Sequence, residues 1–372
     1  MYIKPCIKDI LRIGGQQGRY GFLRLDMNEN PGGLPSEFVE EVKQELTPEY
    51  LAMYPEESRM KKLLADYLTG TVKESVFTEE NLCLTNGSDM CIRYLYEVFA
   101  EPGSTVVTVV PSFEMYRIYA EVFGLKHRPV QIEKTVADSS DAVQNFEEDF
   151  LIPVDTIIDT IQDDTDIVVL LNPNNPVGRP YTDEEFARIA DRAAEVGALL
   201  IVDEAYHYFY KNTFLDQVLK YDHVVILRTF SKLLSLAGCR MGYMVSNPQL
   251  IEYVRHVRPS FEVNSVVLKF GERLLERPEI IDELQQEMQE GKDWLVEELR
   301  ANGYEVTPQE GNFIFMKPKY KGAKELGQIL EREKQVLVKT YGNPMLSDYL
   351  RISTGAKSYM EQFVKALLDV DR

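Results

Sequence analysis

Long apolar runs, paired cysteines and an excess of basic residues are all missing from this chain. No segment approaches the run of about eighteen apolar residues that spans a bilayer, and Met1 to Gly15 lacks the basic and then apolar layout of a secretory signal. We therefore expect a cytoplasmic protein that has no contact with a membrane.

Cysteine is scarce and is not arranged for chemistry. The four cysteines form no CxxC pair and no cluster with histidine at the spacing of a zinc site. Nothing indicates an oxidising compartment, so we expect reduced, structural thiols and no bound metal. These residues are Cys6, Cys83, Cys91 and Cys239.

Basic residues are outnumbered by acidic ones. Lysine and arginine together number 41 against 60 aspartates and glutamates, which gives a formal net charge of -19. A surface of this average charge repels nucleic acid and anionic membranes. Any anionic ligand must therefore bind in a local cationic pocket.

Short β-rich apolar runs alternate with helical patterns from about residue 80 onward. This alternation is typical of an α/β fold with a doubly wound, mainly parallel sheet. In the amphipathic segment Thr182 to Val196, Thr182 and Glu185 form a plausible capping box. The expected strands are Asn81 to Thr85, Ser104 to Val110, Asp166 to Leu171, Ala198 to Val202, Val224 to Arg228 and Gly242 to Ser246.

Beyond about residue 260 the pattern changes to that of a smaller α+β domain. A long charged helix is expected around Pro278 to Asn302, followed by short strands between helices. The expected strands are Gly303 to Val306, Asn312 to Met316 and Tyr349 to Ser353.

Two domains are expected, since 372 residues that are 44% hydrophobic exceed what one compact domain usually holds. We assign residues 34–262 to a large domain, and an N-terminal arm (1–33) with 263–372 to the small one. The segment Asn30 to Pro35, rich in proline and glycine, is expected to link the arm to the large domain. The acidic stretch Glu133 to Asp149 is expected to be a surface excursion.

A cluster of turn formers follows one expected strand. The segment Asn172 to Gly178 reads NPNNPVG and comes directly after the apolar run Ile167 to Leu171. Such a cluster places polar side chains at the carboxyl edge of the sheet, where doubly wound folds bind ligands. An ordinary loop is an equally good interpretation of this segment alone.

Asp203 follows another expected strand and opens the sequence DEAY. A carboxylate after a buried apolar strand is costly unless it meets a cation or a metal ion. Nucleotide hydrolases place a Mg²⁺-binding aspartate in the same way, but this chain has no GxxxxGK[ST] loop to support that interpretation.

Lys232 follows the next strand along the chain, beside the Ser231 hydroxyl and eight residues before Arg240. An amine in this place can form an imine, and the hydroxyl and guanidinium can bind a phosphate. Taken alone, a solvated lysine and arginine in a loop would be the commoner outcome.

The motifs together resemble the pyridoxal-5′-phosphate (PLP) dependent aminotransferases of fold type I, class I/II, and within them the histidinol-phosphate aminotransferase-like subgroup. The resemblance rests on NPNNPVG, DEAY and SK followed by GCRMG, in that order and each just past an expected strand. Supporting segments span nearly the whole chain: Asn28 to Pro31, Tyr54-Pro55, Thr85 to Asp89, Pro111 to Tyr116 and Leu350 to Gly355.

The resemblance implies a role for each central residue. Lys232 would hold PLP as a Schiff base and then move the proton of the substrate α-carbon. Asp203 would keep the pyridine nitrogen protonated, so that the ring withdraws electrons. Asn175 and Tyr206 would bond the phenolic oxygen of the cofactor, and Phe113 would stack on its ring.

The phosphate of the cofactor is expected at the start of a helix, because free N–H groups and the helix dipole attract anions there. Asp89 would cap that helix rather than touch the anion. By resemblance, Tyr54 would reach the phosphate of a neighbouring subunit, which requires a homodimer with shared sites. The other residues of this phosphate site are Gly87, Ser88, Ser231 and Arg240.

Arg351 corresponds to the arginine that binds the substrate α-carboxylate through two parallel hydrogen bonds. Asn175 and Asn30 are further expected substrate contacts. Lys339 stands where histidinol-phosphate aminotransferases carry a second arginine for the substrate phosphate, and a lysine loses the bidentate geometry. We expect an amino acid or amino-alcohol phosphate as donor and a 2-oxo acid, 2-oxoglutarate above all, as acceptor.

Two other functions are compatible with parts of this pattern. A PLP-dependent decarboxylase of an O-phospho amino acid would share the same cofactor residues. A ligand-sensing aminotransferase-like module of a transcription regulator would carry a DNA-binding domain first, whereas the motifs here begin by Asn28 and the charge balance is acidic. We therefore set the regulator aside and keep the decarboxylase as the alternative.

Overall fold

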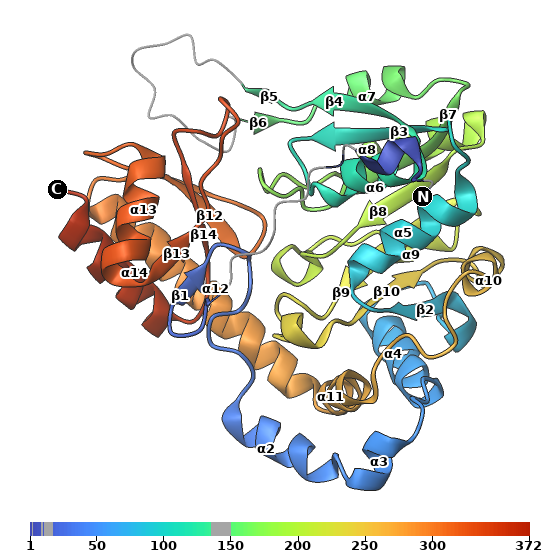
Figure 1. Cartoon of the computed structure of the whole chain (residues 1–372), viewed down its shortest axis with the longest axis horizontal. Helices are drawn as coiled ribbons and strands as arrows, with labels where there is room; N and C mark the ends of the chain where they lie inside the picture. Colours follow the sequence, from blue (N-terminus) through green and yellow to red (C-terminus); the bar gives the residue numbers. More distant parts are fainter. Residues whose placement is uncertain (2, 9, 11–17, 135–149) are drawn as a thin grey trace.

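The computed structural model describes residues 1, 3–8, 10, 18–134 and 150–372. Its centre is a seven-stranded sheet of order β2-β10-β9-β8-β7-β3-β4, in which β10 runs antiparallel to both neighbours and the other pairs are parallel (Figure 1). The strands are β2 (Leu82–Thr85), β3 (Thr105–Val110), β4 (Lys126–Gln131), β7 (Thr165–Leu171), β8 (Leu199–Asp203), β9 (Val224–Thr229) and β10 (Gly242–Val245).

All six strands expected for this sheet are present, with ends within a residue of the expected ones. Edge strand β4 was not expected, because its sequence KHRPVQ carries mostly polar side chains. Inner strands are buried on both faces: Val168 belongs to one core and Ile167 to the other. Burial on both faces explains why these strands are continuous apolar runs.

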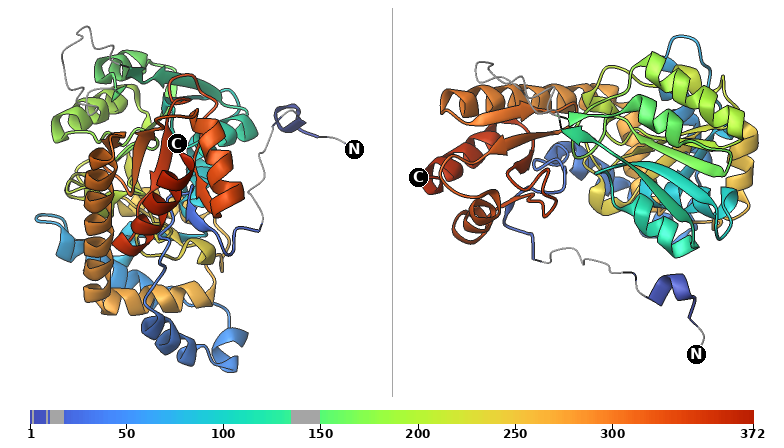
Figure 2. Two further views of the ribbon diagram at one scale, coloured as in Figure 1. Left: turned by 90° about the vertical axis from the view of Figure 1, so that its left-hand side faces the viewer. Right: turned by 90° about the horizontal axis from the view of Figure 1, so that it is seen from above.

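Helices cover both faces of the sheet, as the right-hand view of Figure 2 shows. On one face lie α5 (Ser88–Phe99), α6 (Met115–Phe123) and α10 (Pro248–Arg255). On the other lie α4 (Ser58–Thr71), α7 (Val154–Thr160), α8 (Asp183–Val196), α9 (Leu215–Val218) and α11 (Ser265–Glu276). The capping box of α8 is confirmed, because Thr182 Oγ1 accepts from the Glu185 amide and Glu185 bonds the Thr182 amide in return.

A second, smaller unit holds a three-stranded antiparallel sheet of order β11-β12-β14. Its strands are β11 (Glu305–Pro308), β12 (Phe313–Lys317) and β14 (Leu350–Ser353), covered by α13 (Ala323–Lys334) and α14 (Lys357–Val370). The N-terminal arm joins this unit, since β1 (Leu23–Leu25) pairs in parallel with β13 (Val336–Val338). The expected small α+β unit and its three strands are therefore present.

The long helix α12 (Pro278–Ala301) connects the two units (Figure 1). Its first half packs in the core of the large sheet with Ile281 and Leu284, and its second half packs in the small core with Leu295 and Leu299. A border at residue 262/263 stays a prediction.

The remaining α-helices and strands are α1 (Pro5–Lys8), α2 (Ser36–Glu45), α3 (Pro48–Ala52), β5 (Glu133–Lys134) and β6 (Phe150–Leu151). Short 3-10 helices lie at Glu79–Asn81, His207–Phe209 and Ala237–Cys239. Of the stretch Glu133 to Asp149, all but the first two residues lie outside the described part of the chain. Among the helices described, none combines the length and the apolar character needed to cross a bilayer.

Candidate active site

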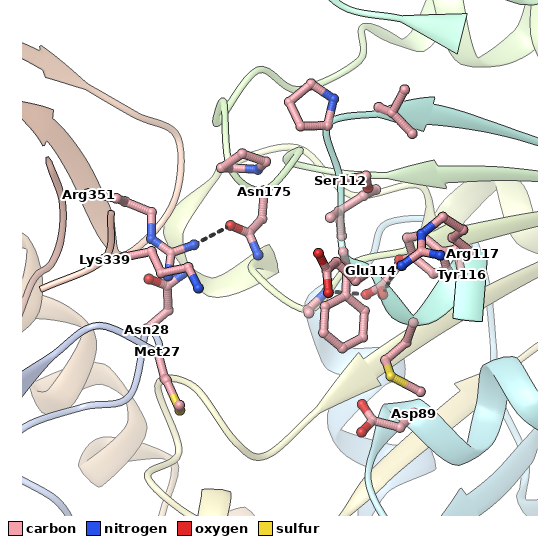
Figure 3. A pocket seen from close by; sticks show the side chains of 18 of the residues that line it. Met27, Asn28, Asp89, Ser112, Glu114, Tyr116, Arg117, Asn175, Lys339 and Arg351 are labelled. Atoms are coloured by element: carbon pink, nitrogen blue, oxygen red, sulfur yellow. Dashed lines mark hydrogen bonds between the residues drawn. The ribbon is translucent and has the colours of Figure 1, made fainter. Parts of the chain in front are cut away.

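A cavity of about 1000 Å³ lies at the carboxyl ends of the parallel strands, between the large sheet and the small unit. Figure 3 shows Arg351, Lys339 and Asn175 on one side of it and Tyr116, Glu114 and Asp89 on the other. Most residues singled out from the sequence line this cavity: Ser88, Asp89, Phe113, Asn175, Asp203, Tyr206, Ser231, Lys232, Arg240, Lys339 and Arg351. Gly87, Asn30 and Tyr54 are not among its lining residues.

Lys232 is held three residues beyond the end of β9, and its Nζ donates to the Met27 carbonyl at 3.0 Å. The ring of Tyr206 lies 5.6 Å from the amine. Burial, and then the positive charge of Arg351, lower the pKa of Lys232 to about 8. A minor fraction of this amine is therefore neutral near physiological pH, and the neutral form is the one that acts as a nucleophile or a base.

Asp203 is the last residue of β8 and is 3% exposed. Its Oδ2 accepts from the Tyr116 hydroxyl at 2.5 Å, and its Oδ1 accepts from the Ala205 amide at 3.0 Å. Among the described residues it forms no salt bridge, and burial raises its pKa to about 6. A buried carboxylate without a counter-ion suits a cationic ring nitrogen brought by a ligand.

The start of α5 forms an anion cradle. Gly87 precedes the helix with φ 81°, and no side chain caps it. A Cβ on Gly87 would lie 2.2 Å from Arg240 Nη2, and one on Gly242 would lie 2.3 Å from the Ser88 nitrogen. The two glycines therefore allow the start of the helix and the Arg240 guanidinium to lie close together. The Ser231 hydroxyl lies beside them, 3.4 Å from Arg240 Nη1. Free amides and a guanidinium fit a phosphate.

Asp89 does not cap helix α5, so this expectation is wrong. The position that would need a capping side chain is held by Gly87, and Asp89 lies inside the first turn. Its carboxylate is 3.7 Å from Arg240 Nη2. An acidic side chain in the first turn is favourable because of the helix dipole, and here it also orients the arginine of the cradle.

Asn28 is a site residue that the sequence did not single out. It adopts a left-handed conformation with φ 56°, its Nδ2 donates to the Tyr206 hydroxyl at 2.9 Å, and it lines the cavity. Asn30 was expected there instead, but its amide is used in the turn that follows. It accepts from the Gly32 amide and donates to Ser235 Oγ, outside the cavity lining.

Arg351 and Lys339 face the cavity from the small unit. They pair through two backbone hydrogen bonds of 2.9 and 3.0 Å, so their side chains lie on the same face. Arg351 donates from Nη1 to Asn175 Oδ1 at 2.7 Å and from Nη2 to the Asp26 carbonyl at 2.6 Å. The two cations thus stand side by side in Figure 3.

Fold and site together define one class of protein, the PLP-dependent enzymes of fold type I. The family model of aminotransferase class I and II matches residues 20–367, and the chain belongs to this family. It is an aminotransferase with PLP as its cofactor.

Individual proteins are similar to this chain in sequence or in fold. The histidinol-phosphate aminotransferase of Syntrophotalea carbinolica is 30% identical over 375 residues, covering 99% of this chain and 100% of the relative. The crystal structure of histidinol-phosphate aminotransferase from Sinorhizobium meliloti in complex with PLP has a TM-score of 0.83 at 20% identity, covering 100% and 97% of the two chains. L-threonine-O-3-phosphate decarboxylase from Porphyromonas gingivalis has a TM-score of 0.71 at 20% identity, covering 93% and 98%.

Proposed function

We propose that this aminotransferase acts on an amino acid or amino-alcohol phosphate similar to histidinol phosphate, with 2-oxoglutarate as the acceptor. The observation that carries the proposal is the pairing of Arg351 with Lys339 on one wall of the cavity. Two neighbouring cations suit a phosphorylated amino acid or a dicarboxylic acceptor, each of which has two anionic groups, and they can also share the single phosphate of an amino-alcohol phosphate. The histidinol-phosphate aminotransferases among the relatives support the same substrate class.

In this proposal, three groups of residues would hold the cofactor. The α5 amides, Ser231 and Arg240 would bind its phosphate, Asp203 its ring nitrogen, and Tyr206 and Asn175 its phenolic oxygen. When bound, PLP supplies an electron-withdrawing ring that stabilises negative charge at the substrate α-carbon. An ionised Asp203 would keep that ring cationic and so strengthen the withdrawal.

Lys232 would be the base. Its Nζ is neutral in part because burial lowers its pKa to about 8, so it would accept the proton of the substrate α-carbon and hold it beside the cofactor. Arg351 would bind the α-carboxylate of amino-acid substrates and of the acceptor in two parallel hydrogen bonds, which orients the α-carbon toward Lys232. Asn175, bonded to Arg351 Nη1, would keep the guanidinium aimed at the substrate.

We also propose a homodimer with shared sites. Tyr54 is 75% exposed, lies outside its own cavity, and stacks on Phe261, itself 54% exposed, with ring centroids 4.5 Å apart. Leu51 and Met53 beside it are exposed as well. Such a grouping of exposed apolar side chains is typical of a protein interface. Sedimentation should give a dimer, and mixing Tyr54→Phe with Lys232→Ala chains should restore some activity.

The substrate proposal is tested by a half-reaction with histidinol phosphate as the sole amino donor. Transamination converts the bound cofactor to its pyridoxamine form and releases a carbonyl product. A decarboxylase acting on O-phosphothreonine would instead release CO₂ and return PLP unchanged. In a parallel assay with O-phosphothreonine, release of CO₂ would overturn the proposal in favour of the decarboxylase if histidinol phosphate also gave no pyridoxamine form.

A further inference from the structure

Tyr116 joins two of the side chains expected around the cofactor ring. It lies in the first turn of α6 and is 2% exposed. Its hydroxyl donates to Asp203 Oδ2 at 2.5 Å, and its ring meets that of Phe113 edge to face, with centroids 5.9 Å apart and planes at 87°. Tyr116 lies in the segment Pro111 to Tyr116, in which only Phe113 is a predicted site residue.

The hydroxyl of Tyr116 is one of only two protein donors to the Asp203 carboxylate among the described residues, the other being the Ala205 amide. Each carboxylate oxygen has one of these donors. An ionised carboxylate has about four acceptor sites, so capacity remains for a ligand N–H. Losing a donor in a buried site raises the free energy of the charged form, because one fewer hydrogen bond then stabilises the charge.

We propose that Tyr116 is a positioning residue that keeps Asp203 ionised and oriented toward the ring nitrogen of the cofactor. The inference rests on the cofactor site proposed above and adds a residue to it. Tyr116 also contacts Phe113 edge to face, and Phe113 is the residue expected to stack on the cofactor ring. One tyrosine side chain therefore contacts both Asp203 and Phe113, the two groups that would contact the ring. Tyr116 itself would not touch the reacting atoms.

The experiment compares two ligands on the apoenzyme. One is pyridoxamine 5′-phosphate, which needs no bond to Lys232, and the other is its analogue with carbon in place of the ring nitrogen. In Tyr116→Phe, pyridoxamine phosphate should bind about tenfold to a hundredfold more weakly, as loss of a hydrogen bond to a charged group predicts. The analogue, which makes no use of Asp203, should bind as in the wild type.

A pH series gives a second readout. The pKa of Asp203 lies near 6 because burial raises it, and the Tyr116 hydroxyl opposes that rise. In Tyr116→Phe the pKa should increase, so the preference for pyridoxamine phosphate over the analogue should disappear at a higher pH than in the wild type. Both ligands carry the same phosphate, and the charged groups near Asp203, which are Asp89 and Lys232, are unchanged.

Two controls separate positioning from packing. Tyr181 is also fully buried, and its hydroxyl has no hydrogen-bond partner in the part of the chain that is described, so Tyr181→Phe should leave the ratio of the two affinities unchanged. In an Asp203→Asn background, Tyr116→Phe should add little, because the group it acts through is gone.

Equal weakening of both ligands by Tyr116→Phe, or no change in either, would overturn the positioning role. If the wild-type apoenzyme binds neither ligand, the proposed cofactor site itself is wrong. If it binds both and only the Tyr116 effect is missing, the cofactor site stands and this inference alone is lost.

Discussion

Two neighbouring carboxylates at the end of strand β8 differ in their charge partners and hydrogen bonds. Glu204 is 0% exposed and pairs with Arg228 at 2.7 Å, with further hydrogen bonds from the Thr213 hydroxyl and the Phe214 amide. Asp203 is almost as deeply buried, yet it has one hydroxyl and one amide as donors and no salt bridge among the described residues.

The difference separates a structural group from a binding group. A buried charge is tolerated when it is paired and hydrogen-bonded, and Glu204 meets this condition within the protein. Asp203 meets it only in part, and burial raises its pKa to about 6. We expect stability to depend on Glu204, and cofactor binding and catalysis to depend on Asp203 and its neighbours in the cavity.

The largest effect is expected on the cavity side, at Lys232. Lys232→Ala should abolish turnover, since no other group is assigned to move the α-proton, while the anion cradle still binds the cofactor in part. Borohydride reduction of the wild type should fix a PLP-sized mass on the peptide that contains Lys232. A reduced adduct on another lysine would refute the assignment.

Asp203→Asn should lower the rate of α-proton abstraction by orders of magnitude while the fold survives. A neutral amide does not hold the pyridine nitrogen protonated, so the ring withdraws electrons less strongly. Single-turnover absorbance changes measure this rate, and circular dichroism checks the fold. Near-normal single-turnover kinetics in the variant would remove Asp203 from the mechanism.

Glu204→Gln should act on stability instead. It leaves Arg228 buried without its charge partner, which costs about 3–5 kcal/mol of unfolding free energy. Glu195→Gln is the matched control, because its ion pair with Arg192 is exposed and contributes less than about 1 kcal/mol. Urea unfolding of the apoenzymes measures both. If the two variants were equally stable, Glu204 would not be the structural member of the pair.

The stability of the apoenzyme should also depend on pH through Asp203. Burial raises the pKa of Asp203 from 3.8 to about 6, so the folded apoenzyme binds this proton more tightly than the unfolded chain does. Its contribution to stability therefore falls as pH rises from 4 to 6 and is constant above. Apo Asp203→Asn lacks this loss and should be more stable than the wild type at pH 8, by about 3 kcal/mol at most. The gain should vanish near pH 4.

Much of this arrangement could be predicted from the sequence, because its signals are local. Strand β9 begins with the apolar run VVIL and Lys232 lies three residues beyond the strand, while Asp203 directly follows the apolar run LLIV as the last residue of β8. Asn28 and Tyr116 were missed because their roles depend on contacts across 178 and 87 residues, with Tyr206 and Asp203. The side-chain oxygen of Asn30 accepts from the Gly32 amide in the turn that follows, so Asn30 does not line the cavity. The motif alone does not reveal this contact.

The smallest effect on activity is expected at Lys339, which would contact the substrate rather than the cofactor. Its backbone pairing with Arg351 puts both side chains on one face, and the ring of Tyr341 lies 6.0 Å from the Lys339 amine. Lys339→Ala should therefore weaken only substrates with a second anionic group, by about 1.5 to 3 kcal/mol, the value of a charge-assisted hydrogen bond. Arg351→Lys should weaken every substrate that carries an α-carboxylate, because a lysine loses the bidentate geometry.

A panel of donors with and without a distal phosphate or carboxylate, assayed by half-reaction on both variants, measures this difference. The proposed contact is to the distal anion, so the ratio of kcat/KM between dianionic and neutral donors should fall in Lys339→Ala and hold in Arg351→Lys. If Lys339→Ala lowered kcat/KM equally for neutral and dianionic donors, the lysine would act only by positioning Arg351 through their backbone pairing. The cavity would then contain one substrate cation instead of two, and the preference for phosphorylated donors would need another source.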